Sequence, residues 1–572
     1  MVIIDIFGDL FNLVNNILEA LIADPIILIQ IISFSIVFIF LVFFIHRLFV
    51  KKRPTRLYSY HIQDEKKFVF IVIALCIGIS ILWNLYFFSF TTDDAFITFR
   101  YSKNLVNGYG IVFNRDNNPV EGYSNFLWVI LSAIPIALNI EILIYTKIFS
   151  MVFSTGSIIL LYKFASQFYD RKVSLFAPLL YSIYYPFHLW TIGGLETPLF
   201  VLLIISAYYF AYKEVCEQQA NTSRKYPIFS IIASFLLCLT RAEGIVYVLG
   251  MEGSLLLIFL FLKKNKKVFV QRIISSAIVG ILYVLYFLWR YSYYGYFFPN
   301  SYYAKGSSAL ITSEGIEYLL TFIAFTTPVF ILFFIGAFKL IRDKKDYNTF
   351  ILFIVPILIN FAIMLNLEAF NAAQGFRFAL PSMPFVIIAS VNFFNPSIKN
   401  EEIISESGGR NQSMRIYIPL ILILFLVIYP GSAPLIYKNT SFTDTNDKHY
   451  LLARWFDDNI PENTSIAYTN LGIFPYYCDM YFIDLWGLMD EYIAQEGFSA
   501  EYVLSRNPTF IIFYRFGPKF YDDPTFQANY ELFFSLILYE IDQYLEEYSV
   551  DLHIFKLKDY GITNESLVQI FQ

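Results

Sequence analysis

The chain has 572 residues, of which 57% are hydrophobic and 20% are aromatic, while only 15% are charged. A water-soluble protein of this length carries a larger charged fraction, so the composition excludes an ordinary soluble enzyme. The net charge of −5 conceals two unlike parts. Residues 441–572 carry 21 acidic and 7 basic side chains, a net of −14, whereas residues 1–440 carry a net of +9. We therefore predict a basic transmembrane domain over residues 1–440 and a soluble acidic domain over residues 441–572.

Hydrophobic runs of membrane-spanning length recur through the first domain and predict a polytopic α-helical membrane protein with about twelve spans. Residues 1–24 predict an amphipathic surface helix that precedes them. The predicted spans are residues 26–46, 68–88, 142–165, 173–188, 198–213, 227–241, 244–262, 269–289, 316–340, 348–366, 378–394 and 416–431.

Basic residues between these spans set the expected orientation. They cluster in every second loop, from Lys51–Lys67 through Lys263–Lys267 to Lys399–Arg415, which is typical of the cytoplasmic side. The loop at about residues 89–125 then lies on the outer face. The apolar residues 126–138 cannot form a full crossing without reversing every later loop, so we expect a half-inserted or interfacial helix. The acidic C-terminal domain also falls outside, and we expect a multi-pass protein of the cell membrane.

Two adjacent carboxylates, Asp93 and Asp94, open the first outer loop within the sequence TTDDAFITFR. Two alternatives explain them. Acids in the first turn of a helix favour its dipole and cap free N–H groups. At a low-dielectric boundary, however, paired carboxylates raise a pKa, and such an acid can accept the proton of a hydroxyl. Arg100 shares a helical face with Asp93 and can keep one acid ionised.

Cations on the other outer segments form the second candidate group. Arg241 lies between two apolar runs, where an ionisable residue is a functional candidate by default. Together with Lys305 and Arg377 it can form an anion site suited to a phosphate. Glu196 in GGLETP and Glu243 in TRAEG are included in the candidate site, although each can instead simply form an ion pair with these cations.

An aromatic cluster, YSYYGYFFPNSYYAKG, ends at Gly306 and includes Tyr302 and Tyr303. Such a cluster forms either a belt at the membrane interface or a surface that stacks on a sugar or lines an isoprenoid groove. His188 has no second ligand at a suitable spacing, so we expect no metal site. In the acidic domain, residues 447–460 predict a helix, and SIAYT, MYFIDL and PTFIIFY predict short buried strands of an α/β fold.

The first outer loop, TTDDAFITFRYSKNLVNGYGIVFNRDNNPVEGYSNFLW, resembles that of the GT-C fold glycosyltransferases. It is most similar to the terminal arabinofuranosyltransferases and their relatives. The resemblance continues in GGLETPLF, LTRAEG, YYGYFFPNSYYAKG, RFALPSMP and LGIFPYYCDMYFIDLWGLMDEYIA. These motifs follow the family order from about Thr91 to Ala494. Tyr109 departs from the pattern, because relatives often have histidine there.

The resemblance implies an enzyme that takes a sugar from a polyprenyl-phosphate donor and transfers it, usually with inversion, to an acceptor hydroxyl at the outer face. It implies Asp93 as the general base, Asp94 as an orienting or second acid, and Arg241, Lys305 and Arg377 as ligands of the donor phosphate. The acceptor is a glycan, a lipid or a protein, and we expect no nucleic-acid partner. Whether a divalent cation (Mg²⁺, Mn²⁺ or Ca²⁺) assists stays open.

Two other functions remain as alternatives. A transporter or flippase of a lipid-linked glycan would place paired charges deep within its spans and would repeat its halves, and the sequence has little of either. A non-enzymatic envelope protein would use the acidic domain to bind a partner and would leave the acid and cation loops without a role.

Overall fold

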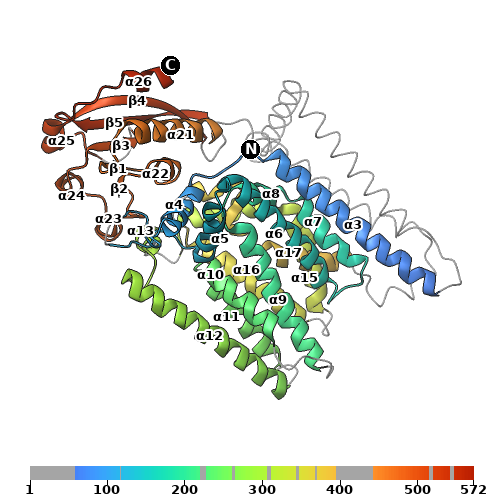
Figure 1. Cartoon of the computed structure of the whole chain (residues 1–572). Helices are drawn as coiled ribbons and strands as arrows, with labels where there is room; N and C mark the ends of the chain where they lie inside the picture. The colour runs from blue at the N-terminus through green and yellow to red at the C-terminus, as the bar shows by residue number, and fades with distance from the viewer. Residues whose placement is uncertain are drawn as a thin grey trace, which may run out of the picture.

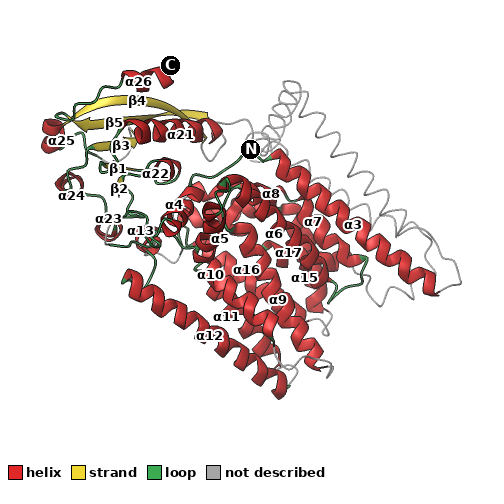
Figure 2. Ribbon diagram, viewed as in Figure 1, coloured by secondary structure: helices red, strands yellow, loops and turns green. Residues whose placement is uncertain are grey.

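The computed structural model describes residues 58–115, 118–219, 227–259, 265–305, 311–342, 347–367, 370–394, 442–514, 519–541 and 547–571. The predicted surface helix at 1–24 and the predicted spans at 26–46 and 416–431 lie outside these residues. A helical body and a smaller C-terminal domain that contains all the described strands lie side by side (Figures 1 and 2).

The helical body follows the apolar runs of the sequence closely. Its helices are α3 (Tyr58–Tyr86), α4 (Asp94–Val106), α5 (Phe126–Ala137), α6 (Ile142–Ala165), α7 (Phe176–Ile183), α8 (Tyr185–Ile192), α9 (Thr197–Gln219), α10 (Ile228–Thr240), α11 (Gly244–Leu257), α12 (Lys266–Tyr294), α13 (Asn300–Lys305), α14 (Ser313–Phe325), α15 (Thr327–Arg342), α16 (Tyr347–Leu365) and α17 (Met383–Val391), with 3₁₀ turns at Val173–Leu175, Phe370–Ala379 and Asn392–Phe394.

Five of the described helices are long and apolar enough to cross a membrane, or six if the bent pair α14–α15 counts as one span. Two predicted spans are broken in the structure. Residues 173–188 divide between α7 and α8, and Pro186 lies in the first turn of α8, where the missing N–H removes no helical bond. Helices α14 and α15 meet at 85°, with Pro328 in the first turn of α15. The count of about twelve spans stays a prediction.

Helix α5 confirms the expected short helix after the first loop. It has 12 residues, which at the rise of an α-helix is about 18 Å, well short of a bilayer core. Its insertion depth in a membrane stays a prediction.

A buried ion cluster joins three helices of the body. Arg272 of α12 donates from Nε to Glu252 of α11 at 3.0 Å and lies 3.6 Å from Glu214 of α9. The pairing partners come from three different helices, so no local sequence pattern predicts this cluster. Arg272 lies near the start of α12, and Arg290 near its other end contacts the first loop. The two residues are 18 positions apart on the helix, which separates them by about 27 Å.

The C-terminal domain is an α/β fold, as the sequence predicted. Its elements are α21 (Phe442–Asn459), β1 (Ser465–Tyr468), α22 (Ile473–Tyr477), β2 (Tyr481–Asp484), α23 (Glu491–Glu496), α24 (Ala500–Ser505), β3 (Phe510–Tyr514), α25 (Pro524–Asn529), β4 (Tyr530–Ile541), β5 (Glu547–Leu557) and α26 (Glu565–Phe571).

The five strands form one sheet in the order β2-β1-β3-β5-β4. Strands β2, β1 and β3 are parallel, and β5 and β4 extend the sheet as an antiparallel hairpin. The connection from β1 to β2 and the connection from β2 to β3 cover opposite faces. Phe474 of α22 packs with Ile466 and Tyr468 on one face, whereas Val503 of α24 packs with Ala467 on the other. Because both faces are covered, the parallel strands are almost continuously apolar.

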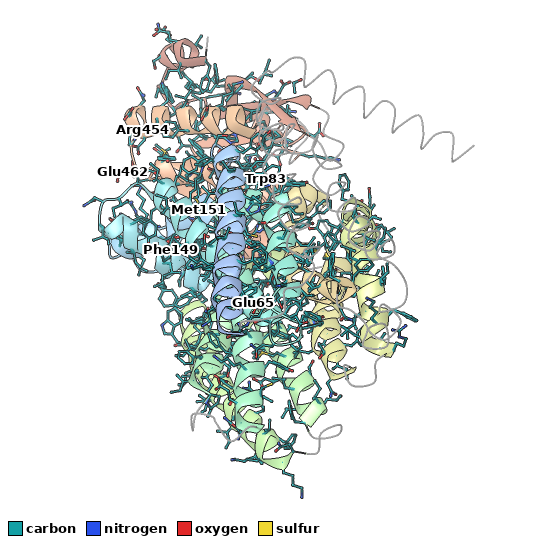
Figure 3. The ribbon with its side chains drawn as sticks, turned by 90° about the vertical axis from the view of Figure 1, so that its right-hand side faces the viewer. Glu65, Trp83, Phe149, Met151, Arg454 and Glu462 are labelled. Carbon is teal, nitrogen blue, oxygen red and sulfur yellow. The ribbon has the colours of Figure 1, made fainter. Side chains whose placement is uncertain are left out.

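The described part of the chain places the first loop between the two domains. Helix α3 runs along the helical body from Glu65 to Trp83, and Trp83 lies at the end nearer the C-terminal domain, where Arg454 and Glu462 are labelled (Figure 3). The chain that leaves this end of α3 leads directly into α4, which packs against α22 of the C-terminal domain.

Candidate functional site

Asp93 lies at the contact between the first loop and the C-terminal domain. Its Oδ1 accepts a hydrogen bond of 2.8 Å from the backbone N–H of Ile473 at the start of α22. Asp93 occupies the N-cap position of α4 but makes no side-chain hydrogen bond to that helix, so its carboxylate does not cap the free N–H groups of α4. The loop that carries this N–H follows the carboxyl end of β1, the edge at which open α/β sheets commonly bind ligands.

The surroundings of Asp93 shift its ionisation. Burial raises the pKa of Asp93 to about 6, the Ile473 N–H opposes the rise, and the charge of the neighbouring Asp94 adds to it. The side chain stays partly exposed. A carboxylate with this pKa is ionised at neutral pH and holds a proton far better than a free aspartate, which are the properties of a general base.

Gly472 fits closely against Asp93. A Cβ atom at residue 472 would lie 2.2 Å from the Asp93 Cγ and 2.3 Å from the Asp93 carbonyl oxygen. Because one of these neighbours is backbone, the contact cannot be relieved by turning a side chain. Only glycine allows the Ile473 N–H to reach the Asp93 carboxylate.

The variant Gly472→Ala is therefore expected to push α22 away from Asp93 and to destabilise the protein by about 1–3 kcal/mol, the usual range for overpacking. Thermal unfolding of the detergent-solubilised protein measures the change. Gly561→Ala is the matched control in the same domain, because nothing lies within 4 Å of a Cβ at that position. Equal unfolding temperatures for the two variants would contradict the close fit.

Glu196 forms the centre of a charge cluster beside the acid pair. Its Oε1 accepts from Nη1 of Arg241 at 3.1 Å and from Nη2 of Arg377 at 2.9 Å. Its Oε2 accepts from the amide of Asn125 at 2.8 Å. Burial raises the pKa of Glu196, but the two guanidinium groups outweigh it and hold the pKa below its usual value. The structure thus confirms that two of the predicted cations converge.

The start of α4 rests on the GGLE segment that carries Glu196. Thr92 donates its N–H to the Gly193 carbonyl at 3.1 Å. Gly194 has φ +87°, and a Cβ there would approach the Ala95 side chain at 3.0 Å. These contacts fix the acid pair relative to Glu196. Arg377 then lies 3.9 Å from the Asp94 carboxylate, the longest of its ion pairs.

Aromatic rings flank the two arginines. The Arg241 guanidinium lies 5.4 Å from the ring centre of Phe200 and 5.5 Å from that of Phe378. The Arg377 guanidinium lies 5.4 Å from the Trp190 ring. Low-dielectric walls of this kind strengthen the field that the arginines present. Glu243 accepts from Nε of Arg241 at 2.6 Å, so both glutamates of the candidate site pair with the cations.

Arg100 serves the junction between the domains. It is 3% exposed and donates to four backbone carbonyls: Phe113 at 2.8 Å, Cys478 at 3.0 Å, Met480 at 2.8 Å, and Pro475. The structure does not bring it to the acid pair, so its expected role beside Asp93 and its place in the substrate site are not supported by the geometry.

Removal of this guanidinium in Arg100→Met is expected to cost about 2–4 kcal/mol, because four buried carbonyls lose a charged donor. The C-terminal domain should then loosen from the first loop and become more sensitive to limited proteolysis. Arg454→Met is the matched control, since Arg454 makes only exposed ion pairs within one helix, typically below about 1 kcal/mol. A proteolysis pattern identical to that of the control would contradict the junction role.

Two further acids hold the first loop in place. Asp479 accepts from Lys103 at 2.8 Å and lies 2.8 Å from Arg115. Glu121 pairs with Arg290, with Nε–Oε2 at 2.7 Å. Asp479, Glu121 and Asn125 have no signal in the sequence, because their partners lie far away in the chain and no local pattern connects them.

The aromatic cluster lies apart from the acid pair in the described contacts. Tyr302 is 54% exposed and packs on Phe298, while Tyr303 contacts the ring of Tyr296. Lys305 ends α13. The side chain of Lys305 lies outside the described residues. Neither tyrosine makes a contact with Asp93 or Asp94 in the part of the chain that the structure describes, and the roles of all three residues stay predictions.

Within the described ranges, no three His, Cys, Asp or Glu side chains gather in a manner that could hold a metal ion. Of the acids near the site, Glu196 already accepts from two arginines and an amide. Asp93 and Asp94 are two further carboxylates beside it, and Mg²⁺ commonly binds through one or two carboxylates together with substrate phosphates. The involvement of a divalent cation therefore stays a prediction.

One family model matches the C-terminal domain of the chain. This model, described as a domain of unknown function (DUF8728), matches residues 439–555. The domain boundary near residue 441 stays a prediction. No curated protein sequence matches the chain.

Solved structures resemble the chain over most of its length. ArnT from Cupriavidus metallidurans in the apo state shares 8% identity with a TM-score of 0.57 and covers 86% of this chain and 98% of its own. The same protein bound to undecaprenyl phosphate has a TM-score of 0.52 at 10% identity, with coverage of 85% and 98%. The oligosaccharyltransferase of Archaeoglobus fulgidus, tethered to an acceptor peptide, has a TM-score of 0.53 at 10% identity, with coverage of 78% and 69%. The chain therefore has the fold of these GT-C membrane enzymes.

Proposed function

We propose that the chain is a membrane glycosyltransferase that transfers a sugar from a polyprenyl-phosphate donor to an acceptor hydroxyl on the outer side of the membrane. The observation that carries this proposal is the site itself: a partly buried carboxylate with a raised pKa lies beside two arginines that share one buried glutamate. The GT-C fold supports it, since ArnT has been solved with undecaprenyl phosphate. The kind of sugar and the membership of the arabinofuranosyltransferase-like group are not part of the proposal.

In the proposed reaction, Asp93 accepts the proton of the acceptor hydroxyl as the hydroxyl oxygen attacks the anomeric carbon of the sugar. The bond from that carbon to the phosphate oxygen breaks, and its electron pair leaves with the phosphate. Arg241 and Arg377 stabilise the charge on this leaving group. Inversion follows when base and phosphate lie on opposite faces of the sugar, and the acid and the cations do come from different segments.

The second acid has a separate proposed role. Asp94 is exposed and is the most distant carboxylate paired with Arg377, at 3.9 Å. An incoming phosphate can displace it at little cost, because exposed ion pairs contribute little. Asp94 thus keeps the phosphate site occupied by a carboxylate until the donor binds, whereas Glu196 keeps the arginines in place throughout.

A transporter of lipid-linked glycans remains the second candidate, favoured by the buried Arg272–Glu252 pair. That pair lies about 27 Å along α12 from Arg290, the residue of this helix that pairs with Glu121 of the first loop.

The test uses the full-length protein in proteoliposomes that contain a radiolabelled polyprenyl-phosphate sugar and a membrane glycan extract. A glycosyltransferase consumes the lipid-linked sugar, releases polyprenyl phosphate and labels the glycan. A transporter moves the labelled lipid to the other leaflet without consuming it. Movement without consumption would overturn the proposal.

A further inference from the structure

A second site lies between the first loop and the C-terminal domain. It is a cavity of about 200 Å³. Asn114 and Asn118 line it from the first loop, and Asp490, Tyr492, Tyr502 and Arg506 line it from the segment between β2 and β3. No role in the reaction above uses these residues.

The walls of this cavity are fixed before any ligand binds. Asp490 is 5% exposed and accepts from the hydroxyl of Tyr502 at 3.1 Å and from Nη1 of Arg506 at 2.8 Å. The rings of Tyr492 and Tyr502 stack with their centres 4.0 Å apart. Asn114 joins the wall to the sheet, because its amide exchanges hydrogen bonds of 2.7 and 3.0 Å with the backbone of Phe482 in the edge strand β2.

The chemistry of the lining suits a neutral sugar. Tyrosine rings offer flat apolar faces to the C–H side of a sugar ring, and Tyr492 is 45% exposed. The Arg506 side chain is 31% exposed and Asn118 is exposed, so their guanidinium and amide groups offer donors and an acceptor to hydroxyl groups. The lining carries two carboxylates, Asp490 and Glu491, against one cation, Arg506, so it disfavours phosphates and acidic sugars. Its volume is below the roughly 300–1,000 Å³ of pockets for drug-sized ligands, which fits a single sugar ring.

The same loop connects this cavity to the acid pair. Helix α4 starts at Asp94, and Arg100 lies about 9 Å further along it. Nε of Arg100 holds the carbonyl of Phe113, a residue of the cavity wall. A ligand that reaches from the cavity to Asp93 must therefore be longer than one sugar.

We propose that this cavity binds one neutral sugar unit of an oligosaccharide acceptor, at a position set back from the hydroxyl that receives the new sugar. The inference rests on the proposed function and makes it more specific, because it names a glycan as the acceptor class. The cavity selects acceptors by length and places the end of the chain near Asp93.

The test measures binding of the purified full-length protein in nanodiscs to a panel of neutral and acidic oligosaccharides. The wild-type protein should bind neutral members, and Tyr492→Ala should weaken this binding by about tenfold or more, since tenfold corresponds to about 1.4 kcal/mol. Trp486→Ala is the control, because Trp486 is 60% exposed in the same domain and lies outside the lining of this cavity. Asp93→Asn should bind the same oligosaccharides as the wild type.

Each other outcome decides against the proposal. Wild-type protein that binds no neutral oligosaccharide, or binds them as well after Tyr492→Ala as before, would overturn it. It would also fail if Tyr492→Ala instead weakened binding of a polyprenyl-phosphate sugar, because the cavity would then hold the donor. These results are separate from the proposed function, which falls only if the protein does not transfer the sugar of a polyprenyl-phosphate donor.

Discussion

Replacement of Asp93 by asparagine is expected to slow sugar transfer by about 10²–10⁴-fold, the usual contribution of a general base. Asparagine has nearly the same shape, and its side-chain oxygen can still accept from the Ile473 N–H. The amide cannot take the proton of the acceptor hydroxyl. Release of polyprenyl phosphate from a labelled lipid-linked sugar in native membranes measures the loss.

Asp94→Asn is the matched control for this prediction. It changes a carboxylate at the neighbouring position, but Asp94 is exposed and faces Arg377 at 3.9 Å. Transfer should stay within about tenfold of the wild type, since a weak exposed ion pair is all that is lost. If Asp94→Asn abolished transfer and Asp93→Asn did not, the roles assigned to the two acids would be reversed.

The pH dependence supplies a second check on the same residue. Because the pKa of Asp93 is raised to about 6 in the folded protein, the wild-type rate should fall below pH 6 as the base becomes protonated. The raised pKa of Asp93 affects stability in the opposite direction: the folded protein becomes more stable, not less, as the pH falls. A carboxyl whose pKa rises on folding destabilises the folded state above about pH 6, and this penalty disappears below about pH 4. Asp93→Asn should therefore not lower the unfolding temperature at pH 7.

Glu196→Gln is expected to destabilise the protein by about 3–5 kcal/mol, the usual cost of removing one partner from a buried ion pair. Arg241 and Arg377 both donate to the same oxygen of Glu196. Without its negative charge, two guanidinium groups face each other in a site that excludes most water. The apparent unfolding temperature in detergent, measured at a fixed heating rate, should fall clearly, and donor turnover should fall with it.

Glu243→Gln gives the comparison for this variant. Glu243 also contacts Arg241, but its side chain is 23% exposed and pairs with that arginine alone. Its loss should cost less than about 1 kcal/mol. The double variant Glu196→Gln/Arg241→Met should recover part of the stability, because it removes one of the unpaired cations. Equal costs for the two glutamates would contradict the central position of Glu196.

Much of the helical architecture is visible in the sequence because apolar runs decide it. Helix α6 occupies residues 142–165 as predicted, and α5 is as short as the basic-loop pattern required. The hydropathy pattern does not predict the breaks within residues 173–188 and 316–340, because the stretches that contain Pro186 and Pro328 are otherwise continuously apolar. The prolines themselves were the available signal.

The site was predictable in its charged side chains and not in its backbone. Asp93, Glu196, Arg241 and Arg377 stand out as ionisable residues beside apolar runs, and the structure brings them together. The N–H of Ile473 gives no sequence signal, because every residue except proline has one. Arg100 was misplaced for a related reason: helical spacing put it on the face of Asp93, but four backbone carbonyls of distant segments hold its guanidinium.

The central claim is that Asp93 is the base of a lipid-dependent glycosyltransferase. Comparative mass spectrometry of envelope glycans from a deletion strain, restored with wild-type protein or with Asp93→Asn at equal expression, tests it most directly. The account predicts a glycan that lacks one sugar in the deletion strain, regains it with the wild-type protein, and does not regain it with Asp93→Asn. Glycans unchanged by the deletion, or fully restored by Asp93→Asn, would contradict it.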